Sequence, residues 1–244
     1  MKRPGFFDGM GYPFRGLKHL LAHRELWSYA VKSLIVGLVL FMVLAGIAGA
    51  LVFGIPGRLF SDGLNWRTGF LGCAAGFLGI VGGIVLFALI GNILAGPFLE
   101  AMTERMMADA GRGRKTPRGY WAAFWAGLVD QGVRFLLFLA VQAGLLGAYL
   151  TPGAFLHPLA AYGVAVFFVA LEHLEYPLVA RGLRFFARIE WALRNPAPAL
   201  GFGTTLFFVM PVAGFLLLPA AVCGAALLEG DLEKATSSSE APAS

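Results

Sequence analysis

Four long stretches of this chain contain no Asp, Glu, Lys or Arg, and this feature constrains the fold more than any other. They are Ser33–Gly57, Thr68–Leu99, Phe135–Leu171 and Asn195–Leu228. The hydrocarbon core of a bilayer is about 30 Å thick, so about 20 consecutive apolar residues suffice for a helix to cross it. Only 14% of the 244 residues are charged, whereas about a quarter are charged in soluble domains. The sequence therefore predicts an all-α integral membrane protein and excludes a large soluble catalytic domain.

Two of the stretches are continuous enough to cross the membrane as single helices. These are residues 33–54, which Ile55-Pro56-Gly57 is expected to end, and residues 68–99. The second span carries five glycines at alternating steps of three and four, which places them on one helix face. Small residues on one face allow a close approach of another helix in lipid. We therefore predict a helix-packing surface made of Gly69, Gly72, Gly76, Gly79 and Gly83.

Prolines interrupt the other two stretches. Residues 135–171 are broken at Thr151-Pro152-Gly153 and at Pro158, and residues 195–228 contain two internal prolines. The pieces of the first stretch, about 16 and 13 residues long, are too short to cross 30 Å at 1.5 Å per residue. We therefore expect two proline-broken helical hairpins that enter and leave on the same side, with their turns sheltered by protein or water.

The two ends of the chain differ from these apolar stretches. Residues 14–32 combine apolar residues at helical spacing with basic residues and a Trp, which predicts an N-terminal interfacial amphipathic helix. Residues 229–244 are acidic and rich in Ser and Ala, so we expect a disordered tail. Residues 1–228 are then expected to form a single membrane domain.

The positive charges indicate the orientation. Two spans followed by two hairpins place 16 of the 19 Lys and Arg residues on one face of the membrane. Cytoplasmic loops carry an excess of Lys and Arg, so this face is predicted to be cytoplasmic.

The basic residues nearest the apolar stretches are candidates for binding an anion. Arg181, Arg184 and Arg188 share one helical stripe, and Arg15 and Lys18 flank the dipeptide Gly16-Leu17. Two interpretations are open: these residues anchor the protein to anionic lipid headgroups, or they bind a soluble anion. A helix that starts at Gly201-Phe202-Gly203 would add free backbone N–H groups to such an anion site, with Gly201 and Gly203 as the donors.

No catalytic residues, metal ligands or cofactor site are predicted. His19 and His23 are four residues apart, but the sequence provides no identifiable third ligand. No phosphate-binding loop, nucleophile elbow or dinucleotide motif is present, and nothing in the sequence indicates nucleic-acid binding.

Several motifs, in order along the chain, resemble those of the CysZ-like sulfate permease family, which is grouped with the etoposide-induced membrane proteins. The segments that carry the resemblance are Arg15-Gly16-Leu17-Lys18, Ala95-Gly-Pro-Phe-Leu-Glu100, Leu171-Glu-His-Leu-Glu-Tyr-Pro-Leu178, Arg181-Gly-Leu-Arg-Phe185, Leu200-Gly-Phe-Gly203 and Met210-Pro211 through Ala226. The resemblance implies a multi-pass protein of the cell inner membrane with two long helices and two partly penetrating hairpins. It also implies a homo-oligomer that takes up sulfate.

Within this resemblance, Gly16, Leu17 and Lys18 match the element associated with sulfate binding, with Lys18 at a position where Arg is common. Our main hypothesis is a transporter or channel that moves a small oxyanion such as sulfate passively into the cytoplasm. The alternative is a membrane scaffold that holds partner proteins and uses its arginines as lipid anchors. A lipid-modifying enzyme that uses Glu100, Glu104, Glu172 and Glu175 is a third hypothesis, but no nucleophile or metal accompanies these carboxylates.

Overall fold

The computed structural model describes residues 3–59, 66–112, 119–149 and 152–240, and within these ranges it contains helices and no strand. The α-helices are α1 (Phe6–Ala22), α2 (Trp27–Leu59), α3 (Trp66–Asp109), α4 (Tyr120–Tyr149), α5 (His157–Ala180), α6 (Phe185–Arg194), α7 (Pro196–Ala213) and α8 (Leu218–Glu240). Short 3-10 turns precede α2, α5 and α8.

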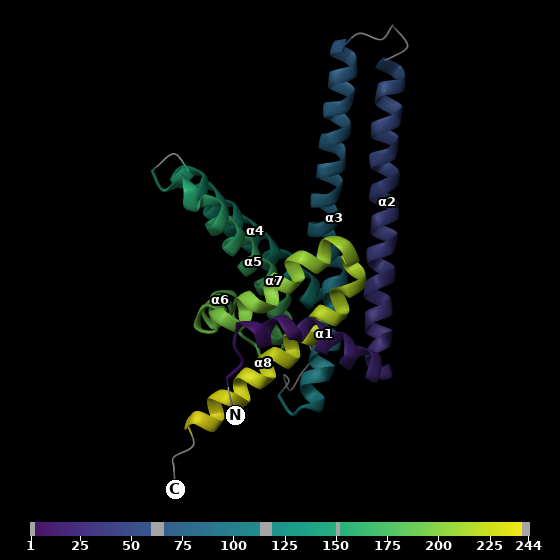
Figure 1. Cartoon of the computed structure of the whole chain (residues 1–244). Coiled ribbons are helices and arrows are strands. Elements are labelled where there is room, and N and C mark those ends of the chain that lie inside the picture. The colour runs from purple at the N-terminus through teal and green to yellow at the C-terminus, as the bar shows by residue number, and fades with distance from the viewer. Residues whose placement is uncertain (1–2, 60–65, 113–118, 150–151, 241–244) are drawn as a thin grey trace.

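Two long helix pairs diverge from a common base (Figure 1). Helices α2 and α3 run side by side as one pair, and α4 and α5 form the second pair, which points in a different direction. Helix α1 lies across the base against α7 and α8, and α7 also packs on α5.

Three described segments are long and apolar enough to cross a membrane: Arg24–Ile47, Tyr120–Gly147 and Ala154–Ala180. The first of them contains most of the predicted span 33–54. The predicted span 68–99 lies within α3, and most of its side chains fall outside the described residues. All-helical structure and apolar helices of this length fit a membrane protein, as the charge-free stretches predicted.

The N-terminal segment forms two helices, so the prediction of one interfacial helix over residues 14–32 is wrong. Helix α1 starts earlier, at Phe6, and ends where His23 adopts an extended backbone with φ −113° and ψ 93°. The break is stabilised because Trp27 donates a hydrogen bond from Nε1 to the Leu20 carbonyl at 2.9 Å. Such side-chain bonds satisfy carbonyls that have no partner at a helix end. Helix α2 therefore already begins at Trp27, and it also continues through the predicted stop at Pro56.

The helices of the first predicted hairpin are longer than the sequence indicated. Helix α4 has 30 residues and α5 has 24, which correspond to about 45 and 36 Å. Both helices extend beyond the charge-free stretch, and Arg134 and Glu175, which lie just outside it, pair across the two helices. The turn does lie at the predicted break, since Pro152 starts a 3-10 turn and Pro158 lies in the first turn of α5. The depth of the hairpin in the bilayer stays a prediction.

The acidic end of the chain is helical up to Glu240, so the expectation of disorder from residue 229 is wrong for residues 229–240. Glu229 is fully buried, and Leu232 belongs to the main hydrophobic core. Acidic composition suggested a solvated segment, but the carboxylates of Glu229 and Glu233 meet arginines that follow the C-terminal ends of α3 and α5.

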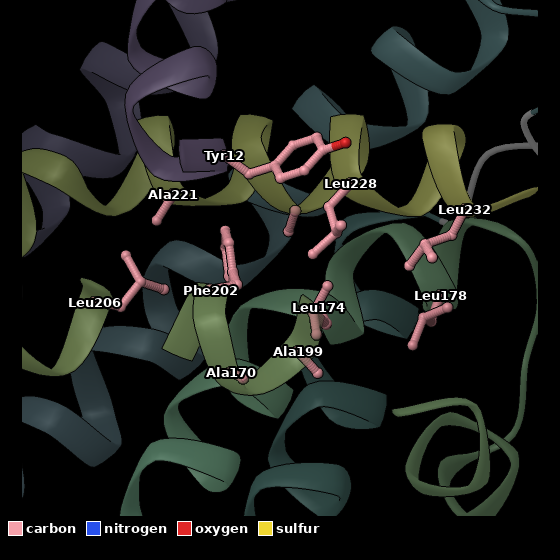
Figure 2. Packing of buried hydrophobic residues seen from close by; sticks show 11 residues of the cluster. Tyr12, Ala170, Leu174, Leu178, Ala199, Phe202, Leu206, Ala221, Leu228 and Leu232 are labelled. Atoms are coloured by element: carbon pink, nitrogen blue, oxygen red, sulfur yellow. The ribbon is translucent and has the colours of Figure 1, made fainter. Parts of the chain in front are cut away.

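The core that joins α1, α5, α7 and α8 lies at the base of the molecule. Figure 2 shows Tyr12 of α1, Phe202 of α7, Leu174 of α5 and Leu228 of α8 packed together. These four side chains are at most 1% exposed. Their packing fixes the position of the charged residues that follow them on α5 and α8.

Candidate functional site

The four residues of the predicted α1 element have different environments. Gly16 is buried against α8, and Leu17 lines a small apolar cavity together with Phe14 and Leu206. Arg15 and Lys18 are exposed, and neither forms an ion pair within the described part of the chain. The guanidinium of Arg15 lies over the Tyr12 ring, 4.9 Å from its centre. This element therefore presents two cations to its surroundings, while its glycine serves helix packing.

The glycines predicted to start a helix lie inside one instead. Helix α7 begins at Pro196, so Gly201 and Gly203 occupy its interior, where backbone N–H groups bond within the helix. A Cβ on Gly201 would overlap the Phe6 carbonyl, and a Cβ on Gly203 would overlap the Val166 carbonyl. We conclude that these glycines allow close helix contacts and do not supply free donors to an anion.

Arg181 binds carboxylates of α8. Its Nη1 lies 2.7 Å from one oxygen of Glu229, and Nη1 of Arg112 lies 2.9 Å from the other oxygen. Glu233 lies 3.3 Å from Arg181 and 3.6 Å from Arg112. This cluster joins the C-terminal ends of α3 and α5 to α8. Arg184, in contrast, forms no ion pair in the described part of the chain; it is exposed and precedes α6 as its N-cap residue.

Burial affects the carboxylate of this cluster. The pKa of Glu229 is raised because burial disfavours its charged form, and the neighbouring Arg181 and Arg112 oppose that effect. The two guanidiniums are balanced by the two carboxylates of Glu229 and Glu233, so this cluster is a structural link and not a free cationic surface.

A second cluster, the Glu175 cluster, lies where α4, α5 and α6 meet. Nη2 of Arg134 donates to both oxygens of Glu175 at 2.7 Å. Arg188 lies 3.5 Å from Glu175 and forms a further short ion pair with Asp130. Arg134 is 6% exposed and Arg188 is 4% exposed. Arg188 was expected at an open anion site, but the structure encloses it between two carboxylates.

The Glu175 cluster borders a small cavity of about 30 Å³ between α3, α4 and α5. Its lining includes Glu100, Gln131, Glu175 and Tyr176, together with Pro97. A cavity of this size is large enough for a water molecule, and its polar lining residues are potential hydrogen-bond partners for one. Within the described parts of the chain, no three His, Cys, Asp or Glu side chains are placed to hold a metal ion.

Sequence reasoning missed several of these residues, above all Arg134, Asp130, Arg112 and Glu229. Their sequence signal was weak, because Asp130, Arg134 and Arg112 were assigned to the predicted cytoplasmic face and Glu229 to the predicted disordered tail. The spacing of Asp130 and Arg134, four residues apart, would place both on one helix face. Their partners Glu175 and Arg188 are more than 40 residues away in sequence, so the pairing itself depends on the tertiary fold.

The predicted glycine surface on α3 stays a prediction. Gly79 is partly buried, while the surroundings of Gly69, Gly72, Gly76 and Gly83 lie outside the described residues. Helices α2 and α3 do run side by side, which is the arrangement that such a surface would serve.

Tyr12 provides a test of how α1 is held on α8. Its hydroxyl donates to Asp231 at 2.7 Å, and burial together with the Asp231 charge raises the Tyr12 pKa well above 10. We expect Tyr12→Phe to lower the free energy of unfolding by about 1–2 kcal/mol at neutral pH. The folded state holds this proton more tightly than the unfolded chain, so the stabilisation is complete below pH 10 and is lost as the pH rises above 10. Denaturation in detergent between pH 7 and 11 would show the difference between the two proteins shrinking, whereas a constant difference would contradict the assignment.

Comparison with known proteins places these features in a family. A family model described as "Sulfate transporter CysZ/Etoposide-induced protein 2.4" matches residues 12–219. Proteins named "Sulfate transporter CysZ" from three strains of Vibrio cholerae serotype O1 are 26% identical to this chain over 222 residues. The match covers 82% of this chain and 89% of those relatives. The chain therefore belongs to the family of the sulfate transporter CysZ and etoposide-induced protein 2.4.

Proposed function

We propose that this protein carries a small oxyanion, with sulfate as the expected ion, through the inner membrane toward the cytoplasm by a passive route. The observation that supports this most is the family match over residues 12–219, together with relatives named sulfate transporters that align over most of their length. No covalent chemistry is needed for this activity.

The charged residues of α4 and α5 favour transport over a scaffold role. Asp130 and Arg134 lie within the apolar segment Tyr120–Gly147, and Glu175 lies within Ala154–Ala180. Ionisable residues in such segments are unfavourable in lipid and typically mark ion pathways. A scaffold that only shapes the bilayer or holds partners has no need for a buried charge cluster at this position.

Arg15 and Lys18 are the residues that we expect to attract the anion. Both are exposed on α1 and carry no carboxylate partner in the described part of the chain, whereas Arg181 and Arg188 are neutralised by Glu229, Glu233, Asp130 and Glu175. Exposed charges of one sign raise the local concentration and the association rate of an oppositely charged ion. Arg184 is exposed as well and is expected to contribute to the same field.

Uptake of radioactive sulfate into proteoliposomes tests the proposal. We expect wild-type protein to carry sulfate, and the double variant Arg15→Ala with Lys18→Ala to carry it about ten-fold more slowly at low ionic strength. The matched control removes the exposed Arg105 and Arg194, which pair with Asp109 and Glu190 on their own helices, and should keep the wild-type rate. An unchanged transport rate in the Arg15 and Lys18 double variant would contradict the assignment of these two residues to the anion site.

Failure of the wild-type protein to carry any anion would contradict transport altogether. The scaffold hypothesis, with arginines as lipid anchors, would then take its place. Sedimentation of the protein with liposomes that contain or lack anionic lipid would show whether the same cations bind headgroups.

A further inference from the structure

Two arginines of the Glu175 cluster have hydrogen-bond donors that no described residue accepts. These are the Nε and Nη1 atoms of Arg134 and the Nε atom of Arg188, all of them buried. Both side chains are more than nine-tenths buried. A buried N–H group without an acceptor is unfavourable, and native proteins contain few of them. These donors therefore point to an acceptor that is not among the described residues, such as a bound ion or a water molecule.

The carboxylates of the cluster are more accessible than its arginines. The side chains of Asp130 and Glu175 are 24% and 16% exposed, compared with 4% for Arg188 and 7% for Arg134. Glu175 also lines the cavity of about 30 Å³, together with Gln131. The arginines thus form the enclosed part of the cluster, and Glu175 has space into which its carboxylate can turn.

The charges of the cluster determine how an anion can bind. Two arginines face Asp130 and Glu175, and Glu172 adds a negative charge one helical turn before Glu175. No excess of positive charge is present, so an anion binds here by taking the place of a carboxylate. Such exchange gives weak binding, which suits an ion that must also leave along a pathway.

We propose that Arg134 and Arg188 form an internal binding site for a tetrahedral oxyanion, in which the Glu175 carboxylate takes the place of the ion when none is bound. This inference rests on the proposed function and adds to it a second site, remote in sequence from Arg15 and Lys18. The planar guanidinium fork of Arg134 matches two oxygens of one oxyanion. The Nε donor of Arg188 supplies a further contact from α6.

The variant Glu175→Gln tests the exchange, because the amide keeps the shape of the side chain but does not compete as an anion. Thermal unfolding in detergent is measured in sodium sulfate and in sodium chloride at equal ionic strength. We expect sulfate to raise the Tm of Glu175→Gln more than that of the wild-type protein. The control Glu190→Gln, which removes an exposed carboxylate from α6, should show the wild-type shift. Equal sulfate shifts in all three proteins would overturn the proposal.

The variant Arg134→Lys provides a second test that keeps the positive charge near Glu175. Lysine lacks the Nε and Nη1 donors of arginine, so we expect the sulfate concentration that gives half of the thermal shift to rise about ten-fold or more. The control Arg194→Lys on the surface of α6 should leave this sulfate concentration unchanged. An unchanged value in Arg134→Lys would also overturn the internal site.

These two measurements do not depend on transport. If wild-type protein carries no sulfate in proteoliposomes, the proposed function fails, while the thermal shifts still decide whether the Glu175 cluster binds the ion. If wild-type protein carries sulfate but the shifts of the variants equal that of the wild type, only the internal site fails.

Discussion

A valine in place of Gly16 is expected to prevent α1 from docking and to leave the protein unable to reach its native structure. A Cβ at this position would overlap the carbonyl of Ala220 and the amide of Gly224, and would lie 2.7 Å from the Gly224 Cα. All three atoms belong to the α8 backbone, which cannot move without breaking its own hydrogen bonds. Overpacking of flexible side chains costs about 1–3 kcal/mol, and a clash with backbone exceeds that range. Size-exclusion chromatography and thermal unfolding of Gly16→Val in detergent would measure the loss of native structure and of stability.

Gly11 provides the matched control on the same helix. A Cβ on Gly11 meets nothing within 4 Å, and alanine is favoured over glycine in a helix by about 1 kcal/mol. We therefore expect Gly11→Ala to be neutral or stabilising. A Gly16→Val protein with wild-type Tm would show that α1 does not lie against α8. Because Gly16 belongs to the element that the sequence predicts to bind the anion, a transport defect at this position needs a folding control before it is assigned to the ion.

Truncation of the chain after Leu228 is expected to have a comparably large effect. It removes Glu229, which is fully buried between Arg112 and Arg181, and Leu232 of the main core. It also removes Asp231, the acceptor of the Tyr12 hydroxyl. Breaking a buried ion pair costs about 3–5 kcal/mol, less where the partners are partly exposed as here, and burial of a leucine contributes about 1.5–3 kcal/mol. The sum approaches the whole stability of a typical domain, so the truncated protein should not fold.

A chain that ends at Ser238 serves as the control, since it retains the contacts of Glu229, Asp231, Leu232 and Glu233. We expect this protein to express and unfold like the full chain. A protein that ends at Leu228 and still shows wild-type thermal unfolding would restore the interpretation of residues 229–240 as a dispensable tail. Glu229→Ala alone should lie between the two truncations in stability.

The predictions from sequence were most accurate where one physical effect dominates. Charge-free stretches of 25 or more residues require helices in a bilayer; α2 and α3 contain the first two of these stretches, and α4 and α5 contain most of the third. The turn at Pro152 was predicted as well, because proline disrupts a helix without help from distant residues. The same rule failed at Pro56, through which α2 continues.

The predictions were least accurate for charged residues and for glycines outside the long spans. Arg188 and Arg181 look the same in sequence as Arg184, yet the first two are neutralised by carboxylates, whereas Arg184 has no carboxylate partner among the described residues. Gly16, Gly201 and Gly203 match motifs that suggest an anion site, and the structure shows all three at close helix contacts. In both cases the environment of the residue depends on a partner that is far away in the sequence: a carboxylate for the arginines and the backbone of another helix for the glycines.

The sequence by itself determined the all-helical membrane class, the approximate positions of the long helices and, through its motifs, the family. These properties follow from the hydrophobicity of consecutive residues and from the order of the motifs along the chain, and both can be read directly from the sequence. The tertiary structure alone decided which cations are free and which are paired, because an ion pair depends on distances of about 3 Å between helices. It also turned the acidic end of the chain from an expected tail into a structural link, and it placed Arg134 beside Arg188 as a candidate internal site for the ion.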